Sequence, residues 1–264
     1  MELSFDKYEG LGNDFIVVEV GHPDALTPAQ AIRLCDRHFG LGADGVLLVS
    51  PSTVLEARAR MIVLNADGSR PEMCGNGLRC VALHLARRDP AGAVAFQIET
   101  DAGLRHCDVR ADGALGIVTT GMGRGVEQGQ THDPAGGGDA FSRISMGNPH
   151  AVCFRQPVSS EELDQLGPRV SAQFAEGSNV EIATVENPAL IRVDVWERGV
   201  GRTLACGTGA AATVVAAARA GLSPFDRPVT VRLPGGPLEI TVSRELEVTL
   251  RGPARWVFSG QTSL

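Results

Sequence analysis

Lysine is almost absent from this 264-residue sequence, in which Lys7 is the only one. A pyridoxal-phosphate enzyme needs a lysine amine for its Schiff base, and Lys7 precedes the first strand-like segment instead of standing in a glycine-rich phosphate site. Dense clusters of Lys and Arg are also absent, and the formal net charge is −7. These features argue against pyridoxal phosphate and against nucleic acid or an anionic membrane surface, and they favour small molecules as partners.

Long apolar runs are absent as well, since none approaches membrane-spanning length. Residues 1–7 lack the positively charged stretch and apolar core of a signal peptide, so we expect a cytoplasmic protein with no membrane partner. The spacing of cysteine and histidine fits no zinc site, and nothing indicates secretion. We therefore expect no metal, no cofactor and six reduced cysteines, at positions 35, 74, 80, 107, 153 and 206.

An internal repeat is the clearest structural signal in the chain. Four pairs of segments recur in the same order at offsets of 132 to 135 residues: Gly12-Asn13 and Gly147-Asn148, Thr27 to Gln30 and Ser159 to Glu162, Phe39 to Asp44 and Phe174 to Asn179, and Cys74 to Gly77 and Cys206 to Gly209. The second of these pairs has the spacing of a helix capping box. This shared order indicates duplication of one α/β unit and predicts two homologous domains that meet near residue 118.

The elements around the two Cys-Gly-x-Gly segments are predicted to match as well. Runs rich in Ala, Leu and Val predict helices over 75–88 and 207–220. A hairpin is expected after each helix, one with its turn at 101–103 and one with its turn at 234–236. The glycine-rich stretch 121–138 predicts an exposed, mobile loop without a catalytic role.

A cysteine directly before a helix lies close to unpaired backbone N–H groups and to the positive end of the helix dipole. Both favour the thiolate over the thiol, so Cys74 and Cys206 are expected to be primed as bases. The glycines that follow let the backbone approach a ligand closely, and the first-turn N–H groups can bind a carboxylate. Each helix start thus combines a base with an anion site.

Two such helix starts facing one small acid would favour inversion of its α-carbon. One thiolate would remove the α-proton while the other thiol would deliver a proton to the opposite face. The N–H groups would stabilise the charge that develops on the carboxylate oxygens. The residues alone therefore predict a cofactor-independent, two-base epimerase or racemase acting in a cleft between the domains.

The sequence resembles the diaminopimelate epimerase family along essentially its whole length. The resemblance is carried by Gly10-Leu-Gly-Asn-Asp-Phe15, Asn65-Ala-Asp-Gly-Ser69, Cys74-Gly-Asn-Gly-Leu-Arg79, Met146-Gly-Asn-Pro-His150, Glu197-Arg-Gly199 and Ala205-Cys-Gly-Thr-Gly209. It implies an α+β fold of two domains, each a mixed, barrel-like sheet around a central helix. It also implies that the last strand returns to the first domain, giving domains of 1–118 with 253–264 and of 119–252.

The same resemblance implies interconversion of LL- and meso-2,6-diaminopimelate, a step toward lysine and peptidoglycan precursors, with Cys74 and Cys206 exchanging protons. His150 and Glu197 are implied to tune the thiols, and a homodimer is familiar in the family. The residues implied to bind substrate are Asn13, Asn65, Gly75, Asn76, Asn148, Asn179, Glu197, Arg198, Gly207 and Thr208. Three positions depart from the family pattern, namely Arg202 in place of Glu, Ala175 in place of Pro, and Gly45 where some members have Gln.

Other interpretations stay open at this stage. A proline racemase or hydroxyproline epimerase also uses paired cysteines, although it typically has His where Asn76 stands and Ser-Pro where this chain has Leu204-Ala205. A thiol-disulfide protein more often has a close Cys-x-x-Cys pair, and a carboxylate-binding module would need the helix starts without the thiols. Cys74 and Cys206 could also be buried structural thiols, which is the role expected of the other four cysteines.

Overall fold

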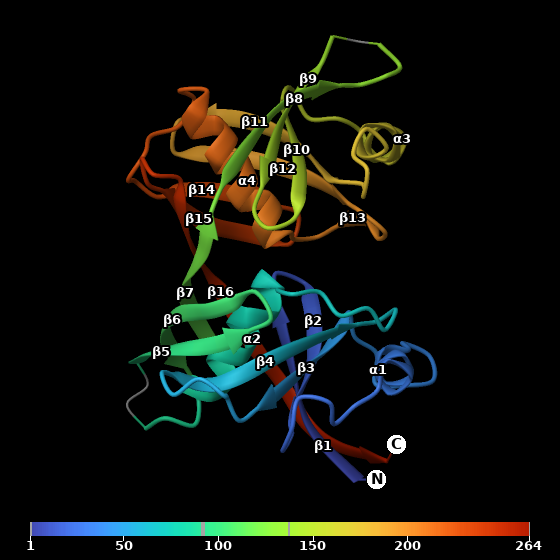
Figure 1. The fold of residues 1–264 in the computed structure, drawn as a ribbon, viewed down its shortest axis with the longest axis vertical. Helices are drawn as coiled ribbons and strands as arrows, with labels where there is room; N and C mark the ends of the chain where they lie inside the picture. The colour runs from blue at the N-terminus through green and yellow to red at the C-terminus, as the bar shows by residue number, and fades with distance from the viewer. Residues whose placement is uncertain (1, 91–92, 137, 264) are drawn as a thin grey trace. The chain divides into compact units, whose positions relative to one another are not determined.

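The computed structural model describes residues 2–90, 93–136 and 138–263. The chain forms two compact units, which we call unit 1 (Met1–Thr120 with Gly252–Leu264) and unit 2 (Gly121–Arg251), shown in Figure 1. The domain boundaries expected from the sequence, after residue 118 and before residue 253, lie within two residues of the boundaries between these units. In the described residues, no helix is long and apolar enough to cross a membrane.

Unit 1 is a closed, mixed β-barrel. Its strands are β1 (Glu2–Gly10), β2 (Asn13–Glu19), β3 (Gly45–Ser50), β4 (Ala57–Asn65), β5 (Ala93–Thr100), β6 (Gly103–Asp112), β7 (Leu115–Arg124) and β16 (Glu247–Ser263). They pair in that order, and β16 also pairs with β1, which closes the ring and places the two chain ends side by side (Figure 1). The β2–β3 and β4–β5 pairs are parallel and the other described pairs are antiparallel.

The helix α2 (Gly75–Ala86) lies inside this barrel, and every one of its residues is buried. Apolar residues of α2 face several directions, as is typical of a helix inside a core, and Leu78, Val81 and Leu83 pack against strand residues that include Leu47. The shorter α1 (Pro28–Cys35) covers β3 and β4 from outside. The capping box predicted before α1 forms with both of its hydrogen bonds, between Thr27 and Gln30.

Unit 2 repeats this plan around α4 (Gly207–Arg219), whose Ala- and Val-rich sequence lets the strands approach it closely. Its strands are β8 (Val126–His132), β9 (Ala140–Ser145), β10 (Pro149–Phe154), β11 (Asn179–Asn187), β12 (Leu190–Glu197), β13 (Gly201–Thr203), β14 (Val229–Leu233) and β15 (Gly236–Val242). They pair in the order β15-β14-β12-β11-β10-β9-β8, with β13 on β12 and the start of β16 on β15. Helix α3 (Ser160–Ser171) packs outside, against β11 and β12.

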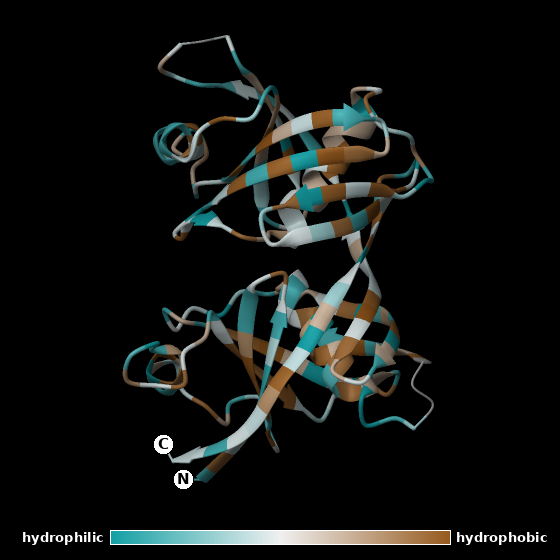
Figure 2. Ribbon diagram, turned by 180° about the vertical axis from the view of Figure 1, so that it is seen from behind, coloured by the Kyte–Doolittle hydropathy of each residue, from teal (hydrophilic) through white to brown (hydrophobic). Residues whose placement is uncertain are grey.

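Apolar and polar residues alternate along many strands of each unit, as the brown and teal bands in Figure 2 show. This alternation places one face of each strand on the central helix and the other toward solvent or an outer helix. The predicted α+β class, with a mixed sheet around a central helix in each half, is confirmed.

The stretch 121–138 is mostly exposed, as predicted, but it is not a loop for most of its length. Its first residues complete β7, and β8 pairs antiparallel with β9. The register shifts between Glu127 and Gln130, where Gly129 has a φ of 87°. The mostly polar side chains of β8 are exposed, as is typical of an edge strand, so composition alone suggested a loop. Residue 137 lies outside the described residues.

Candidate active site

Cys74 and Cys206 cap the two central helices with nearly the same geometry. Cys74 has φ −135° and ψ 113°, and its sulfur accepts a hydrogen bond from Gly77 N at 3.4 Å. Cys206 has φ −123° and ψ 108°, and its sulfur accepts from Gly209 N at 3.3 Å. The repeat therefore produces two equivalent helix starts in which the sulfur takes the place of the usual capping oxygen.

Gly77 and Gly209 leave room for a strand residue directly beneath each helix start. A Cβ on Gly77 would lie 2.9 Å from Cδ2 of Leu47, and one on Gly209 would lie 2.6 Å from Oε1 of Glu181. The N–H groups of a first helical turn have no partner within the helix, so those of residues 75–76 and 207–208 can bind an anion beside each sulfur.

In unit 1 a chain of amide groups runs away from the start of α2. Nη2 of Arg79 donates to Oδ1 of Asn76 at 2.9 Å, and Nδ2 of Asn76 donates to Oδ1 of Asn13 at 3.2 Å. Nδ2 of Asn13 then donates to Oδ2 of Asp44 at 2.6 Å. Two of the residues expected to bind substrate, Asn13 and Asn76, are thus brought together and held by partners that fix their orientation.

Asn65 stands at the end of β4, on a turn that leads toward Cys74. Its Nδ2 donates to Oγ of Ser69 at 2.9 Å, and Ser69 N donates to Oδ1 of Asp67 at 2.8 Å. Gly68 has a φ of 83°, which is the left-handed conformation that glycine adopts without strain. These contacts hold the Asn65 side chain within its own turn.

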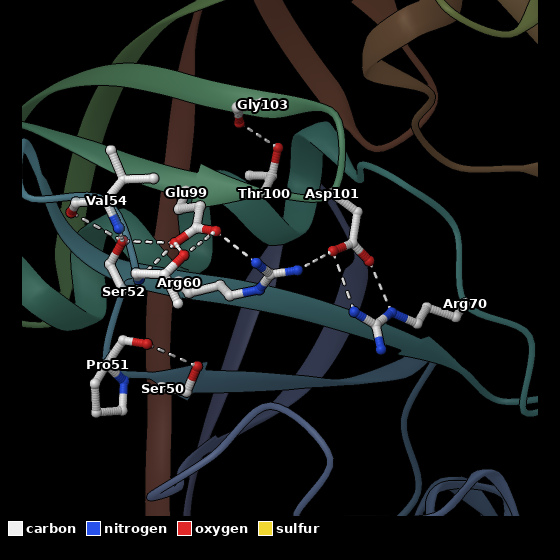
Figure 3. A network of polar contacts seen from close by, with 11 residues as sticks. Ser50, Pro51, Ser52, Val54, Arg60, Arg70, Glu99, Thr100, Asp101 and Gly103 are labelled. Atoms are coloured by element: carbon white, nitrogen blue, oxygen red, sulfur yellow. Dashed lines mark hydrogen bonds and ion pairs between the residues drawn. The ribbon is translucent and has the colours of Figure 1, made fainter.

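Two arginines hold the β5–β6 turn against the segment that precedes Cys74 (Figure 3). Nε of Arg70 donates to Asp101 at 2.7 Å, and Nη2 of Arg60 donates to the same carboxylate at 2.6 Å. Ala102 N also donates to the carbonyl oxygen of Glu72 at 3.2 Å. Hydrogen bonds from Arg70 and Arg60 lower the pKa of Asp101. This network fixes the segment that carries the first cysteine.

Unit 2 has a buried acid–base pair beneath Cys206. Nδ1 of His150 lies 2.7 Å from Oε1 of Glu181, and both side chains are fully buried. Nε2 of His150 lies 3.2 Å from Oδ1 of Asn148, whose Nδ2 donates to Oγ1 of Thr208 at 3.4 Å. That hydroxyl is 3.5 Å from the sulfur of Cys206. A continuous path of polar contacts therefore joins Glu181 to the second cysteine.

Glu197 is the second carboxylate near Cys206. Its Oε1 accepts from Oγ1 of Thr203 at 2.5 Å, and its side chain is also hydrogen-bonded to Cys206. Burial raises the pKa of Glu197, which the hydrogen bonds from Thr203 and Cys206 offset only in part. The carboxyl group can therefore exchange a proton with the thiol at a higher pH than an exposed glutamate could.

The surroundings of Cys206 oppose the priming expected from its position at a helix start. The helix start does act in that direction, since the hydrogen bonds from Thr208 and Gly209 lower the pKa of this thiol. However, burial raises the pKa most, and the negative charges of Glu197 and Glu181 raise it further, to well above the usual value. Burial and the two carboxylates therefore favour the thiol form of Cys206, which is the acid form of the pair.

Arg198 is exposed and is held against the loop at the start of β11. Its backbone N–H donates to Oδ1 of Asn179 at 2.9 Å, and its Nη1 donates to the carbonyl oxygen of Glu176 at 2.6 Å. Asn179 and Arg198, both expected to bind substrate, are thus neighbours. Arg202, one of the departures from the family pattern, donates to Oδ1 of Asp164 at 2.8 Å, so its charge is paired on the outer helix α3.

The other two departures are simpler in structural terms. A Cβ on Gly45 would lie 3.0 Å from the carbonyl oxygen of Leu64 and 3.5 Å from the ring of Phe15, so a longer side chain would need the strands to shift. Ala175 is exposed.

The four remaining cysteines are buried, and burial raises the pKa of Cys35 and Cys153 to about 11 and of Cys107 to about 12. Packing in the core therefore explains the positions of these four cysteines.

A cavity of about 960 Å³ opens in unit 1 beside His84, at the last turn of α2. Asp6, Glu19 and Arg88 line it together with His84. Cys74 caps the opposite end of the same helix, so this cavity is not part of the half-site around that cysteine.

Comparison with known proteins decides the family. The diaminopimelate epimerase family model matches residues 5–126 and 142–257. A diaminopimelate epimerase from Synechococcus elongatus is 43% identical over 285 aligned positions, which cover 100% of this chain and 99% of that protein. The chain belongs to the diaminopimelate epimerase family.

Further relatives agree with this assignment. The diaminopimelate epimerase of Heliobacterium modesticaldum is 40% identical and covers 99% of this chain and 100% of its own. Among solved structures, a hydroxyproline epimerase from Agrobacterium vitis superposes with a TM-score of 0.80 at 15% identity, over 100% of this chain and 93% of that one. A PhzF-family phenazine biosynthesis protein from Bacillus anthracis gives 0.73 at 13%, over 100% of each chain. At such identities these two structures show a shared fold alone.

The structure adds three residues that sequence reasoning did not select for the site of this diaminopimelate epimerase family member. They are Asp44 and Arg79 in unit 1 and Glu181 in unit 2. Arg79 and Glu181 each interrupt an otherwise apolar segment that is predicted to be buried, and a lone charge in such a place is a usable signal. Asp44 could have been found because the repeat aligns it with Asn179.

Proposed function

We propose that this isomerase interconverts LL- and meso-2,6-diaminopimelate without a cofactor, and that Cys74 and Cys206 exchange protons with the α-carbon. The proposal is supported chiefly by the matched capping geometry of the two cysteines, in a chain that belongs to the diaminopimelate epimerase family. Each unit supplies one sulfur and one set of first-turn N–H groups. That two such half-sites serve one substrate in a cleft stays a prediction.

The reaction starts with one cysteine as thiolate and the other as thiol. In one direction the Cys74 thiolate removes the α-proton, and the Cys206 thiol delivers its proton to the opposite face of the carbon. One C–H bond breaks and another forms, so the configuration is inverted and no group is gained or lost. The first-turn N–H groups of α2 and α4 stabilise the charge on the carboxylate while the proton is absent.

After this step Cys206 is a buried thiolate that must be supported. Glu197 and His150 serve as the thiol-tuning groups, because Glu197 is hydrogen-bonded to Cys206 and His150 is joined to it through Asn148 and Thr208. In the reverse direction Cys206 is the base and Cys74 the acid.

Substrate recognition is assigned to the polar groups that surround the two helix starts. The N–H groups of Gly75, Asn76, Gly207 and Thr208 bind the reacting carboxylate. The amide groups of Asn13, Asn65, Asn148 and Asn179 can both donate to carboxylates and accept from ammonium groups, and Glu197 can accept from an ammonium group. Arg198 can bind the distal carboxylate with its planar guanidinium group.

Proton exchange in D₂O tests the proposal. The reduced protein is incubated with LL-diaminopimelate, and α-deuterium incorporation and configuration are followed by NMR and chiral chromatography. Cys74→Ala and Cys206→Ala are expected to abolish inversion, while Cys153→Ala, the matched control at a buried cysteine of β10, is expected to retain it. Absence of exchange in the unmodified protein would refute the proposal, and full activity of either active-site variant would refute the two-cysteine mechanism.

A further inference from the structure

Asp44 lies among the polar residues of unit 1 that are assigned to substrate recognition. It directly precedes β3, and its backbone N–H donates to the carbonyl oxygen of Asp14 at 2.9 Å. Its own carbonyl oxygen accepts from the backbone N–H of Ala66 at 3.1 Å. The backbone of Asp44 therefore joins β2, which begins at Asn13, to the turn that begins at Asn65.

The side-chain carboxylate of Asp44 faces a hydrogen-bond donor at each oxygen. Its Oδ2 accepts from the backbone N–H of Asp14 at 2.9 Å and from Nδ2 of Asn13 at 2.6 Å. Its Oδ1 accepts from Nη2 of Arg37 at 2.8 Å. A backbone N–H and a guanidinium group can only donate. Both oxygens must therefore accept, a condition that a carboxylate meets and an amide does not.

The charge of Asp44 belongs to a balanced group of two cations and two carboxylates. Arg37 bridges the carboxylates, because the nitrogen that donates to Asp44 also donates to Oδ1 of Asp14 at 2.6 Å. Lys7, the one lysine of the chain, forms an ion pair with Asp14 and donates to the carbonyl oxygen of Gly42. These charge-assisted contacts anchor the segment that carries Asp44.

The amide of Asn13 has one orientation that satisfies all of its neighbours. At one end of the series, Nη2 of Arg79 can only donate, and it faces Oδ1 of Asn76. The nitrogen of Asn76 therefore points to Asn13, where it meets Oδ1 at 3.2 Å. At the other end, the nitrogen of Asn13 faces the carboxylate of Asp44. A cation and an anion thus fix the orientation of both amides from opposite ends.

Unit 2 differs from unit 1 at the position of Asp44. The repeat aligns Asp44 with Asn179, which carries an amide, and it aligns Asn13 with Asn148. Nδ2 of Asn148 faces the hydroxyl group of Thr208, which can both donate and accept. An acceptor that fixes the amide of the strand asparagine is therefore a feature that distinguishes the half-site of unit 1 from its counterpart.

We propose that Asp44 is a positioning residue, which holds the nitrogen of Asn13 so that Asn13 meets the substrate as a hydrogen-bond donor to a carboxylate group. The proposal rests on the proposed epimerase function. Asp44 takes one N–H of the Asn13 amide, which leaves the second N–H for the substrate. Through Asn76 this amide is joined to the first turn of α2, whose N–H groups also donate. Together these donors form one anion site beside Cys74.

Asp44→Asn tests the positioning role with a side chain of the same shape. Whichever way the new amide is turned, its nitrogen faces a donor, either Arg37 or the N–H groups of Asn13 and Asp14. We expect KM for LL-diaminopimelate to rise by about ten-fold or more, and kcat to change by less than about three-fold, because the contact is made before as well as during proton transfer. Asp112→Asn, at an exposed aspartate of β6, is the control and should leave both unchanged.

Exchange of the two side chains separates this role from a merely structural one. In Asn13→Asp with Asp44→Asn, a carboxylate and an amide still meet, the net charge is unchanged, and residue 13 can still accept from Asn76. Residue 13 can then only accept, so it cannot donate to a substrate carboxylate.

The double variant should be more stable in urea than Asn13→Asp alone, which places two carboxylates in contact. Its KM should nevertheless stay about ten-fold or more above that of the unmodified protein. A double variant with restored KM would overturn the proposal, as would an Asp44→Asn variant with unchanged KM.

Direct binding distinguishes failure of this proposal from failure of the proposed function. Isothermal titration with meso-diaminopimelate measures Kd without relying on turnover, and Kd should rise in Asp44→Asn but not in Asp112→Asn. If the unmodified protein exchanges the α-proton while Asp44→Asn binds with unchanged Kd, the positioning role is refuted and the function stands. If Kd rises as expected while the unmodified protein exchanges no proton, the function is refuted and the contact stands.

The unmodified protein provides a final test that needs no Asp44 variant to fold. In ¹⁵N-labelled protein, the side-chain amide of Asn13 is assigned by its loss in Asn13→Ala. On addition of LL-diaminopimelate, one of its two protons should move downfield as it forms a hydrogen bond to a carboxylate, while the proton held by Asp44 stays in place. If neither proton moves at saturating substrate, Asn13 does not donate to it and the proposal is overturned.

Discussion

Inside the barrel of unit 1, Nη2 of Arg79 donates to the side-chain oxygen of Asn76 at 2.9 Å, one turn after Cys74. Arg79 is fully buried, and it also donates to the carbonyl oxygens of Gly75 and Pro253, at 3.2 Å and 3.0 Å. Burial lowers the pKa of its guanidinium group. Two oxygen acceptors in the first turn of α2 and one in β16 thus depend on one side chain.

Arg79→Met is expected to lower the free energy of unfolding by about 2–4 kcal/mol, because three oxygen acceptors, two of them in buried contacts, lose their donor. Release of Asn76 should also raise KM. Urea denaturation and steady-state kinetics measure the two effects. Arg88→Met, at an exposed arginine near the end of the same helix, should change the stability by less than about 1 kcal/mol. Equal losses from both variants would contradict the assigned role of Arg79.

Gly209→Ala should disrupt the second helix start. The added Cβ would lie 2.6 Å from Glu181 and 3.3 Å from the sulfur of Cys206, so the carboxylate or the thiol must move. We expect a loss of about 1–3 kcal/mol in stability and about a hundred-fold loss in kcat. Gly121→Ala, where a Cβ meets nothing within 4 Å, is the control and should change stability by less than about 0.5 kcal/mol. A fully active Gly209→Ala variant would show that the close packing is not needed.

Glu197→Gln should lower activity, and its effect on stability should depend on pH. Burial raises the pKa of Glu197 above its value in the unfolded chain. Folding therefore favours the protonated form of Glu197. The resulting contribution to stability is fully present below the unfolded-state pKa, near 4.3, and is lost as the pH rises through the folded-state pKa. The neutral glutamine avoids that loss, so relative to the unmodified protein the variant should be more stable at pH 8 than at pH 4.

Urea unfolding at the two pH values measures this difference, and deuterium exchange measures activity. The variant should lose most of its exchange at Cα, because glutamine lacks the titrating carboxyl group that is hydrogen-bonded to Cys206 and tunes its thiol. A variant with full activity, or one whose relative stability does not change with pH, would contradict the role and the environment assigned to Glu197.

Asp101→Asn should weaken the network that precedes Cys74. Hydrogen bonds from Arg70 and Arg60 lower the pKa of Asp101, so its contribution to stability is present above the unfolded value near 3.9 and is lost as the pH falls through the folded value. We expect a destabilisation of about 1 kcal/mol at pH 7 that is smaller at pH 2, with a few-fold lower kcat.

Unfolding curves at both pH values and steady-state kinetics test this. Asp89→Asn, which removes the carboxylate partner of Arg58 elsewhere in unit 1, should leave kcat unchanged. A loss of stability in Asp101→Asn that is the same at pH 2 and pH 7 would mean that its charge is not involved.

Local patterns predicted much of this architecture. The recurrence of the Cys-Gly-x-Gly segments, the hairpins after each helix and the capping signal at Thr27 all depend on residues close together in the chain, so spacing was enough to find them. The strand β8 was missed because its polar side chains carry no burial signal and its pairing with β9 is not written in its own sequence. Helix ends also differed slightly, with α2 ending at Ala86 and α4 at Arg219.

The site was harder to anticipate because its electrostatics depend on contacts between distant segments. The position of Cys206 before a helix correctly suggested hydrogen bonds to its sulfur, but the carboxylates that raise its pKa come from β11 and β12. Only the folded structure shows that burial and these charges raise the pKa of Cys206 by more than the helix start lowers it. Similarly, nothing in the order of residues indicates that Glu181 lies beneath Gly209.

The capping role of the two sulfurs has a pharmacological consequence. An electrophile that alkylates Cys74 or Cys206 converts a hydrogen-bond acceptor of the central helix into a thioether, which is a weak acceptor. It also introduces bulk at the point where the helix begins. Covalent inhibition at either residue would thus be coupled to loosening of the unit that contains it, so an inactivated molecule would also be a better substrate for cellular proteases.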